Sequence, residues 1–481
     1  MHPDRVPFAG LTERAATLIA RAPHMPLPED VARAARRAIL DTTACILSGL
    51  NDPLAGILIA DQIAQGGRAE ARVPDPDAAR APHSMTARQA ALILGTLGHV
   101  DDWDDTQVSR DPNHRYGLLM HPSAPVLGAL LALAERARHH GQPLSGGRFI
   151  CAFAVGVEIA CKLSEGSRAA VYERGFQSTS VYGPLGAAAA AAVTLGLDAP
   201  RANLALGVAA SRAAGLRAQY GRRIKAMHAG FAAEAGVIAV DLVRAGVDAA
   251  EAVLDGEWGL PHVLGGPPPP DKVIGNFADP WSLVDPGLSV KPYPSGILTH
   301  QTMDAMAALV AAHGVRADAI AGIEIRASSS ITQAIRYPRA RTPLEAKFCL
   351  PALLAMIVIA GRAGPAEFSD AFLARAETRA LQERITLRHD PELDRGGHAA
   401  IRSALQVRLT DGRVLDAVAP LAYRGGPDHP MSAKDMAAKL AAAATGRLGP
   451  AGQERLRDTI AALGTAPDAA VILDALCPAQ P

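Results

Sequence analysis

The stretch GPLGAAAAAAVTLGLD (183–198) constrains the fold of this chain more than any other. Its six consecutive alanines favour a helix, and Gly196 is the kind of residue that ends one. Because alanine side chains are short, helices that pack on this segment can approach it closely. The sequence therefore predicts a bundle of tightly packed helices around residues 183–198.

Helical patterns extend over residues 1 to about 265. Glu29 to Leu47 carries small and apolar residues at helical spacing, and Thr86 with Gln89 has the form of a capping box. A helix is therefore expected from about residue 87 towards Val100. The segment GGPPPPDK (265–272) suits neither a helix nor a central strand, so it indicates a loop or a domain border.

The pattern changes after about residue 288. The segment 319–328 alternates isoleucines with polar residues as a strand does, and 404–419 is a hairpin that turns at Asp411-Gly412. Between them, Glu345 to Gly361 and Pro365 to Thr378 have helical patterns, and helical spacing returns from residue 431.

The predicted fold class is mainly α with an α+β second domain. A large all-helical domain is expected from residues 1–287 plus 421–481, where the C-terminal tail returns to the N-terminal part. A smaller α+β lid domain, residues 288–420, is expected to be inserted between them.

Composition excludes several functions. The 481 residues include 48 Lys plus Arg against 48 Asp plus Glu, so no net charge attracts nucleic acid or an anionic membrane. The five cysteines form no CxxC pair, which fits a reducing cytosol. With no apolar run of membrane-spanning length and no signal peptide, we expect a cytoplasmic protein without nucleic-acid or membrane partners.

The stretch HVDDWDDTQ (99–107) places four carboxylates around one tryptophan. It could be a metal site, an acid/base site or a solvated helix end, although negative charge at a helix C-terminus is opposed by the helix dipole. It also matches the aspartate-rich pattern with which all-helical prenyl-diphosphate enzymes hold magnesium. That interpretation requires a second such motif, and the sequence has none. We therefore predict no metal and no cofactor.

Three polar clusters remain as site candidates. The first joins Asp102 and Thr106 to His121, which precedes a helix that starts at Pro122-Ser123, so the imidazole would lie at the positive end of the helix dipole. The alternative is that His121 has a structural role only.

The second cluster is GRRIKAMH (221–228). Arg222 and Arg223 carry like charge beside Lys225, which favours the neutral amine that a general base requires. The alternative is a basic turn that faces solvent. The third cluster, Lys291 and His300, lies at the expected domain border, with Thr299 as a helix cap.

With these three clusters in this order along the chain, the sequence resembles the MmgE/PrpD family. That family includes 2-methylcitrate dehydratases, cis-aconitate decarboxylases and iminodisuccinate epimerases. The resemblance covers nearly the whole chain and rests on HVDDWDDT, MHPSAPVLGALLALAE, GFQSTSVYGPLGAAAAAAVTLGLD, IKAMHAGFAAEAGVIAVDLV, VKPYPSGILTH, PLEAKFCLPALLA and GGPDHPMS. It implies homodimers and cofactor-free chemistry on small di- or tricarboxylates.

The resemblance also implies roles for residues that match the family's motifs. We assign acid/base catalysis to His121 and Lys225, with Asp102 orienting His121. Thr106 would hydrogen-bond the substrate and His300 would reach in from the domain border. The predicted substrate-binding residues are Gln177, Lys291, Arg222, Arg223 and His228.

This sequence departs from the family pattern at two places. The loop from Gln107 to Met120 is longer than usual, and Gln177 replaces a histidine that lines the active site in relatives. Glutamine can hydrogen-bond a carboxylate but cannot exchange a proton near neutral pH. Gly296 stands where some decarboxylases have a further histidine.

The function expected from these residues is a cofactor-independent lyase that removes a proton next to a carboxylate of a small polycarboxylate, a dehydratase rather than a decarboxylase. An isomerase or epimerase on the same site is an alternative. A catalytically silent binding protein is another, because of Gln177. If the site is real, Asp102, Thr106, His121, Gln177 and Lys225 should converge on one pocket.

Overall fold

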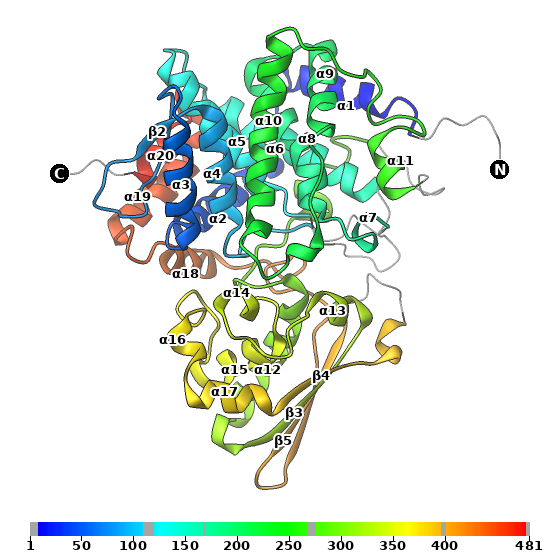
Figure 1. Cartoon of the computed structure of the whole chain (residues 1–481), viewed down its shortest axis with the longest axis vertical. Helices are drawn as coiled ribbons and strands as arrows, with labels where there is room; N and C mark the ends of the chain where they lie inside the picture. The colour runs from blue at the N-terminus through cyan, green and yellow to red at the C-terminus, as the bar shows by residue number, and fades with distance from the viewer. Residues whose placement is uncertain (1–7, 109–119, 167–169, 267–275, 396–400, 478–481) are drawn as a thin grey trace.

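The computed structural model describes residues 8–108, 120–166, 170–266, 276–395 and 401–477. Their buried apolar side chains form two separate cores. One joins residues between 8 and 283 to residues 440–476, and the other draws almost entirely on residues 293–419. Figure 1 shows a helical part above a smaller part that contains a sheet. The predicted fold class, mainly α with an α+β second domain, is confirmed. The boundaries near 287 and 420 remain a proposal.

The helical part is built from both ends of the chain. In Figure 1, α18 to α20 lie beside α2 to α4. This part contains a small antiparallel strand pair, β1 (Ala71–Val73) and β2 (His83–Met85). Its helices are α1 (Leu11–Arg21), α2 (Glu29–Gly49), α3 (Pro53–Gln65), α4 (Ala87–His99), α5 (Ser123–His139), α6 (Gly146–Gly166), α7 (Ala170–Glu173), α8 (Ser178–Leu195), α9 (Ala199–Ala210), α10 (Ile224–Arg244), α11 (Leu260–Gly265), α18 (Ala433–Ala443), α19 (Pro450–Ala461) and α20 (Val471–Leu476).

Small residues set the spacing at the centre of this bundle. A Cβ at Gly128 of α5 would lie 2.6 Å from the backbone nitrogen of Gly95 in α4, and one at Gly156 of α6 would lie 2.7 Å from the carbonyl of Gly186 in α8. Neither contact is possible, so these helices meet backbone to backbone. The expected helix end at Gly196 is confirmed, with φ of 65°.

Helix α10 is long and apolar enough to cross a membrane by length and composition. In the structure it packs against α4, α5, α8 and α9, and 67% of its most apolar window is buried. Its apolar character is therefore explained by its central place in the helical core.

The α+β part contains a four-stranded sheet of order β4-β3-β5-β6. Strand β3 (Ile320–Ala327) pairs parallel with β4 (Ile385–His389) and antiparallel with β5 (Ser403–Leu409), which pairs with β6 (Val414–Val418) across the predicted turn. The helices are α12 (His300–His313), α13 (Ser329–Ala334), α14 (Pro343–Ala346), α15 (Leu350–Ala360), α16 (Asp370–Leu373) and α17 (Ala376–Glu383).

Two predicted helices of this part are wrong in extent. The segment 345–361 breaks between α14 and α15, because Pro351 has no N–H to donate to the carbonyl of Lys347. That carbonyl accepts from Gly296 N instead, at 3.0 Å. The segment 365–378 starts late, at Asp370, where the hydroxyl of Ser369 accepts from Phe372 N and caps α16. Strand β4 was not predicted.

The chain passes between the two parts at two adjacent places. The first passage, after Gly287, makes a two-residue bridge with the loop after α4, in which Thr106 and Ser289 exchange backbone hydrogen bonds of 3.0 and 2.8 Å. The return passage is tied to the first, since Val290 N donates to Gly425 O at 2.9 Å. Both passages therefore lie next to the aspartate-rich loop.

Candidate active site

The aspartate-rich loop is not a solvated helix end. Helix α4 ends at His99, and the side chains that follow turn into the protein: Asp102 and Trp103 are 3% exposed, and Asp104 and Asp105 are 0% exposed. Asp102 has φ of 53°, a left-handed conformation that is uncommon for a residue with a side chain. Such a backbone persists only where its surroundings hold it, which is typical of functional sites.

Two lysines hold the carboxylate of Asp102. Oδ1 accepts from Lys225 Nζ of α10 at 2.7 Å and from Lys291 Nζ at 3.0 Å. Burial raises the pKa of Asp102, but the two ammonium groups outweigh it and hold the pKa far below the ordinary value. Burial lowers the pKa of Lys291, and Asp102 opposes that shift. The cluster carries two cations against one anion, so it suits an anionic substrate.

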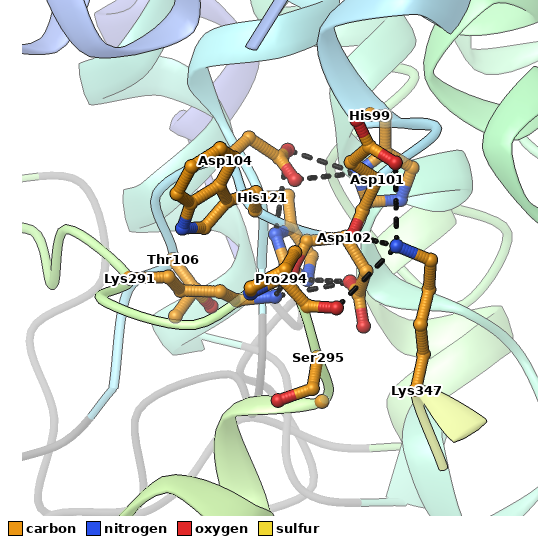
Figure 2. Close-up of polar contacts among 12 residues, drawn as sticks. His99, Asp101, Asp102, Asp104, Thr106, His121, Lys291, Pro294, Ser295 and Lys347 are labelled. Carbon is orange, nitrogen blue, oxygen red and sulfur yellow. Dashed lines mark hydrogen bonds and ion pairs between the residues drawn. The ribbon is translucent and has the colours of Figure 1, made fainter. Parts of the chain in front are cut away.

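Asp104 orients two histidines (Figure 2). His99 Nδ1 lies 2.8 and 2.9 Å from its two oxygens, and His121 Nδ1 lies 3.4 Å from one of them and 2.9 Å from the carbonyl of Asp105. His121 Nε2 lies 4.0 Å from Asp102 Oδ1. The prediction that Asp102 orients His121 therefore needs a correction, because the lysines occupy Asp102 and Asp104 faces the ring nitrogen.

Burial sets the protonation of both rings. It lowers the pKa of His99 to about 4, against the opposing effect of Asp104. It also lowers the pKa of His121, again opposed by Asp104. Both imidazoles are therefore neutral at pH 7, and His121 can accept a proton on Nε2 there.

Lys347 of the α+β part reaches the same loop. Its Nζ donates to Asp101 O at 2.7 Å and lies 3.3 Å from Asp101 Oδ1, while Asp101 Oδ2 accepts from Ser48 at 2.5 Å. The ring of Phe348, next along the chain, stacks on Tyr220 of the helical part at 5.3 Å. These contacts close the two parts over the loop.

A small cavity lies where these groups meet, with a volume of about 30 Å³. One water requires roughly 10–15 Å³ by the same measure, so the space is far smaller than a tricarboxylate. Substrate entry therefore requires its walls to move. It is lined by Asp102, His121, Tyr172, Tyr220, Lys225, Lys291, Gly296, Ile297, Leu298, Ala334, Ile335 and Phe348.

The predicted residues do not all reach this cavity. Asp102, His121, Lys225 and Lys291 line it, whereas Thr106 does not. The hydroxyl of Thr106 is fully buried and donates to Met120 O at 3.0 Å, which contradicts its predicted hydrogen bond to substrate. The short bridge that Thr106 makes with the first passage turns its side chain away. Most of the long loop 107–120 lies outside the described residues.

Gln177 and His228 form a pair beside the cavity rather than in its wall. Gln177 Oε1 lies 3.1 Å from His228 Nδ1 and 3.2 Å from Ser180 N at the start of α8. Burial lowers the pKa of His228 to about 4, with the charges of His99 and Lys225 adding to that shift. The two side chains therefore make a neutral hydrogen-bonded pair, and their binding to substrate stays a prediction.

The remaining predicted residues lie at the edges. Arg222 and Arg223 line a separate space of about 10 Å³ with Asp102 and Lys225, and Arg223 Nε contacts Asp52 at 3.3 Å. The like-charge argument for Lys225 thus omitted the carboxylate that holds it.

His300 is fully buried in the α+β part. Its Nε2 contacts Ser295 O at 3.2 Å, so it does not reach into the cavity as predicted. Thr299 makes no capping hydrogen bond, because a 3₁₀ turn over Ile297–Thr299 leads directly into α12 and its hydroxyl donates to Gly296 O at 2.7 Å.

Sequence reasoning missed several members of the site. Asp104 and His99 belong to the quoted HVDDWDDT motif, and Lys347 belongs to PLEAKFCL, so their motifs were a usable signal. Tyr172 and Tyr220 had none. Tyr172 is buried in the cavity wall, next to Arg217 and Tyr220.

Four side chains of the site offer possible metal-ligand atoms that lie within 4.8 Å of one another: His99, Asp102, Asp104 and His121. The sequence analysis did not identify this grouping. Lys225 and Lys291 place two ammonium groups on Asp102, and this positive charge opposes a metal cation. The donor set therefore fits a metal poorly. An assay of activity before and after EDTA treatment tests this.

Two domain models of one protein family match most of this chain. The MmgE/PrpD N-terminal domain matches residues 13–272 and the MmgE/PrpD C-terminal domain matches residues 293–465. Cis-aconitate decarboxylase of Homo sapiens is 29% identical over 363 residues, 74% of this chain and 72% of the relative. The Aspergillus terreus cis-aconitate decarboxylase is 25% identical, with 80% of each chain covered. The 2-methylcitrate dehydratase of Cupriavidus necator is 27% identical, covering 80% of this chain and 79% of the relative. This chain belongs to the MmgE/PrpD family.

Proposed function

We propose that the protein is a cofactor-independent lyase, a dehydratase or a decarboxylase, that acts on a small di- or tricarboxylate. The observation that carries the proposal is the buried group of Lys225, Lys291 and Asp102 at a cavity that His121 also lines. A net positive cluster binds carboxylates, and a neutral imidazole next to it exchanges protons. The relatives named above support the reaction class.

The chemistry needs one group that takes a proton and one that gives a proton. In a dehydration, the base removes hydrogen from the carbon next to a carboxylate, the C–O bond breaks, and the hydroxyl leaves as water with a proton from the acid. In a decarboxylation, the C–C bond to the carboxylate breaks, CO2 leaves, and the electron pair that stays on the carbon takes a proton from the acid. We assign these proton transfers to His121 and Lys225, with Lys291 stabilising the enolate-like charge.

Closure by the α+β part serves this chemistry. Lys347 and Phe348 bring the two parts together over the cavity, and the remaining space holds little water. A dry site strengthens the attraction between lysines and substrate. We expect substrate to bind when the parts separate and to react when Lys347 returns to Asp101.

A substrate panel tests the proposal. Purified protein is assayed with 2-methylcitrate, cis-aconitate and iminodisuccinate, before and after EDTA treatment. We expect turnover of a carboxylate that persists in EDTA and is lost in Lys225→Met, while the exposed Lys434→Met on α18 keeps it. Epimerisation without elimination would replace the lyase with an isomerase. Carboxylate binding without turnover would indicate a binding protein, and a magnesium requirement would reject cofactor independence.

We further propose that the protein works as a homodimer in the cytoplasm, as its family resemblance implies. Light scattering on the eluted protein tests the first part. A monomer at micromolar concentration would contradict it.

A further inference from the structure

A second cavity lies against the aspartate-rich loop and shares no lining residue with the active-site cavity. Its volume is about 320 Å³, about ten times that of the active-site cavity and within the range of small-molecule sites. It is bounded by α2, by the turn Leu283–Gly287 and by the two passages between the parts of the molecule. Asp105 of the aspartate-rich loop lines it as well.

Asp105 lines this cavity and has a buried polar atom without a partner among the described residues. The residue is 0% exposed, and its Oδ2 accepts from the hydroxyl of Ser123 at 2.6 Å, but Oδ1 has no hydrogen-bond partner among the described residues. Buried polar atoms are nearly always paired, so this oxygen points to a bound group that satisfies it.

Two arginines of α2 line the same cavity, one turn apart. Arg33 is exposed and forms no ion pair with a described residue, and Arg37 uses one nitrogen to donate to Met431 O at 2.9 Å. Asp30 also lines the cavity, with its carboxylate accepting from Val31 N at 2.9 Å. The two guanidinium groups against one carboxylate leave a net positive charge.

The remaining wall is largely apolar, since Leu283, Leu288, Val290 and Pro427 contribute to it. We propose that this cavity is a second ligand site, for a small organic acid with an apolar body and a hydroxyl at its other end. The carboxylate would pair with Arg33 and Arg37, the body would lie against the apolar wall, and the hydroxyl would bond to Asp105.

The site is coupled to the candidate active site through one residue. The backbone carbonyl of Asp105 accepts from His121 Nδ1 at 2.9 Å, so a ligand that moves Asp105 also moves His121. Burial and the charge of Asp41 raise the pKa of the Asp105 carboxyl well above its ordinary value. A raised pKa extends the pH range over which the carboxyl is protonated, and the protonated form can donate as well as accept, which suits a hydroxyl partner.

Calorimetric titration of the full-length protein with 6-hydroxyhexanoate, hexanoate and 1,6-hexanediol tests this proposal. We expect 6-hydroxyhexanoate to bind at least tenfold more tightly than either of the others, because each lacks one of the two polar ends. Binding should weaken at least tenfold in Arg33→Gln/Arg37→Gln, and also in Ala34→Leu, which fills the cavity without changing charge.

Two controls separate this site from others. Arg36→Gln lies on the same helix but pairs with Glu29 at 2.7 Å and does not line the cavity, so binding should be unchanged. Lys225→Met alters the active site and should also leave it unchanged. Absence of binding, equal binding by hexanoate, or loss of binding in Lys225→Met with retention in the arginine variant would overturn the proposal.

Discussion

Asp102 and Asp105 are three residues apart in one loop, and both are removed from solvent, yet the pKa values of their carboxyl groups are shifted in opposite directions. Two lysines overcome the effect of burial on Asp102 and keep its pKa low. On the other side of the loop, burial raises the pKa of Asp105, and Asp41 raises it further. The charge of Lys439 opposes this shift, but Lys439 is already bound to Asp41 at 2.6 Å.

The difference shows that burial alone does not set ionisation. Removing a carboxylate from water always opposes its charge, so the outcome depends on which cations the fold brings within reach. Lys225 and Lys291 come from positions 123 and 189 residues beyond Asp102. One loop thereby presents a carboxyl of lowered pKa to the active-site cavity and a carboxyl of raised pKa to the second cavity.

The largest effect should follow from removing the charge of Asp102. In Asp102→Asn, two buried ammonium groups lose their counter-charge, and we expect the free energy of unfolding to fall by about 3–5 kcal/mol. Urea denaturation at pH 7 measures this. Asp318→Asn, which breaks an exposed pair with Arg316, should cause no measurable change. A loss for Asp102→Asn as small as for that control would break the comparison.

Removing one of the two lysines should affect catalysis more than stability. In Lys225→Met, Lys291 still neutralises Asp102, so stability should fall less than in Asp102→Asn. If Lys225 takes part in proton transfer, kcat should fall by about 10²–10⁴-fold on the substrate identified by the panel. Steady-state kinetics give the answer, and a change in KM alone would reduce Lys225 to a binding residue.

The pH dependence of kcat/KM tests the imidazole beside Asp102. Because burial lowers the pKa of His121, a base at this position stays neutral at pH 7, and activity should fall only as the pH drops below 6.5. Asp104 opposes that lowering, so Asp104→Asn should move the acid limb to lower pH still. A shift to higher pH would exclude His121 as the base.

The smallest effect is expected at Asp105. Asp105→Asn replaces a carboxyl of raised pKa with an uncharged amide of similar shape, so the free energy of unfolding at pH 7 should change by less than about 1.5 kcal/mol. The direction in which stability changes with pH also follows from the pKa shift. A raised pKa in the folded state means that the wild type loses stability as the pH rises above the ordinary value of 3.8.

The Asn variant lacks that loss, so its stability relative to wild type should improve with rising pH. Asp102→Asn should do the opposite, because the low pKa of Asp102 contributes stability above pH 3.8 that is lost as the pH falls. Urea midpoints at several pH values between 2 and 8 measure both, the effect of Asp102 below pH 3.8 and that of Asp105 above it. Parallel curves for the two variants would refute the assigned difference.

The sequence by itself determined the local elements and the family. The capping box of Thr86 and Gln89, the helix end at Gly196 and the hairpin at Asp411-Gly412 all appear as predicted. These features depend on hydrogen bonds between residues a few positions apart, so their pattern is visible in a short stretch of sequence. The motifs that carry the resemblance also named Asp102, His121, Lys225 and Lys291 as site residues.

Only the tertiary structure decided what each of these residues does. It assigned the lysines to Asp102 and the histidines to Asp104, turned Thr106 and His300 away from the cavity, and raised the pKa of Asp105 at a second one. The charge of Asp102, for example, depends on lysines that lie 123 and 189 residues away in the chain. Coulombic interaction and burial act through space, so a pattern along the sequence cannot fix them.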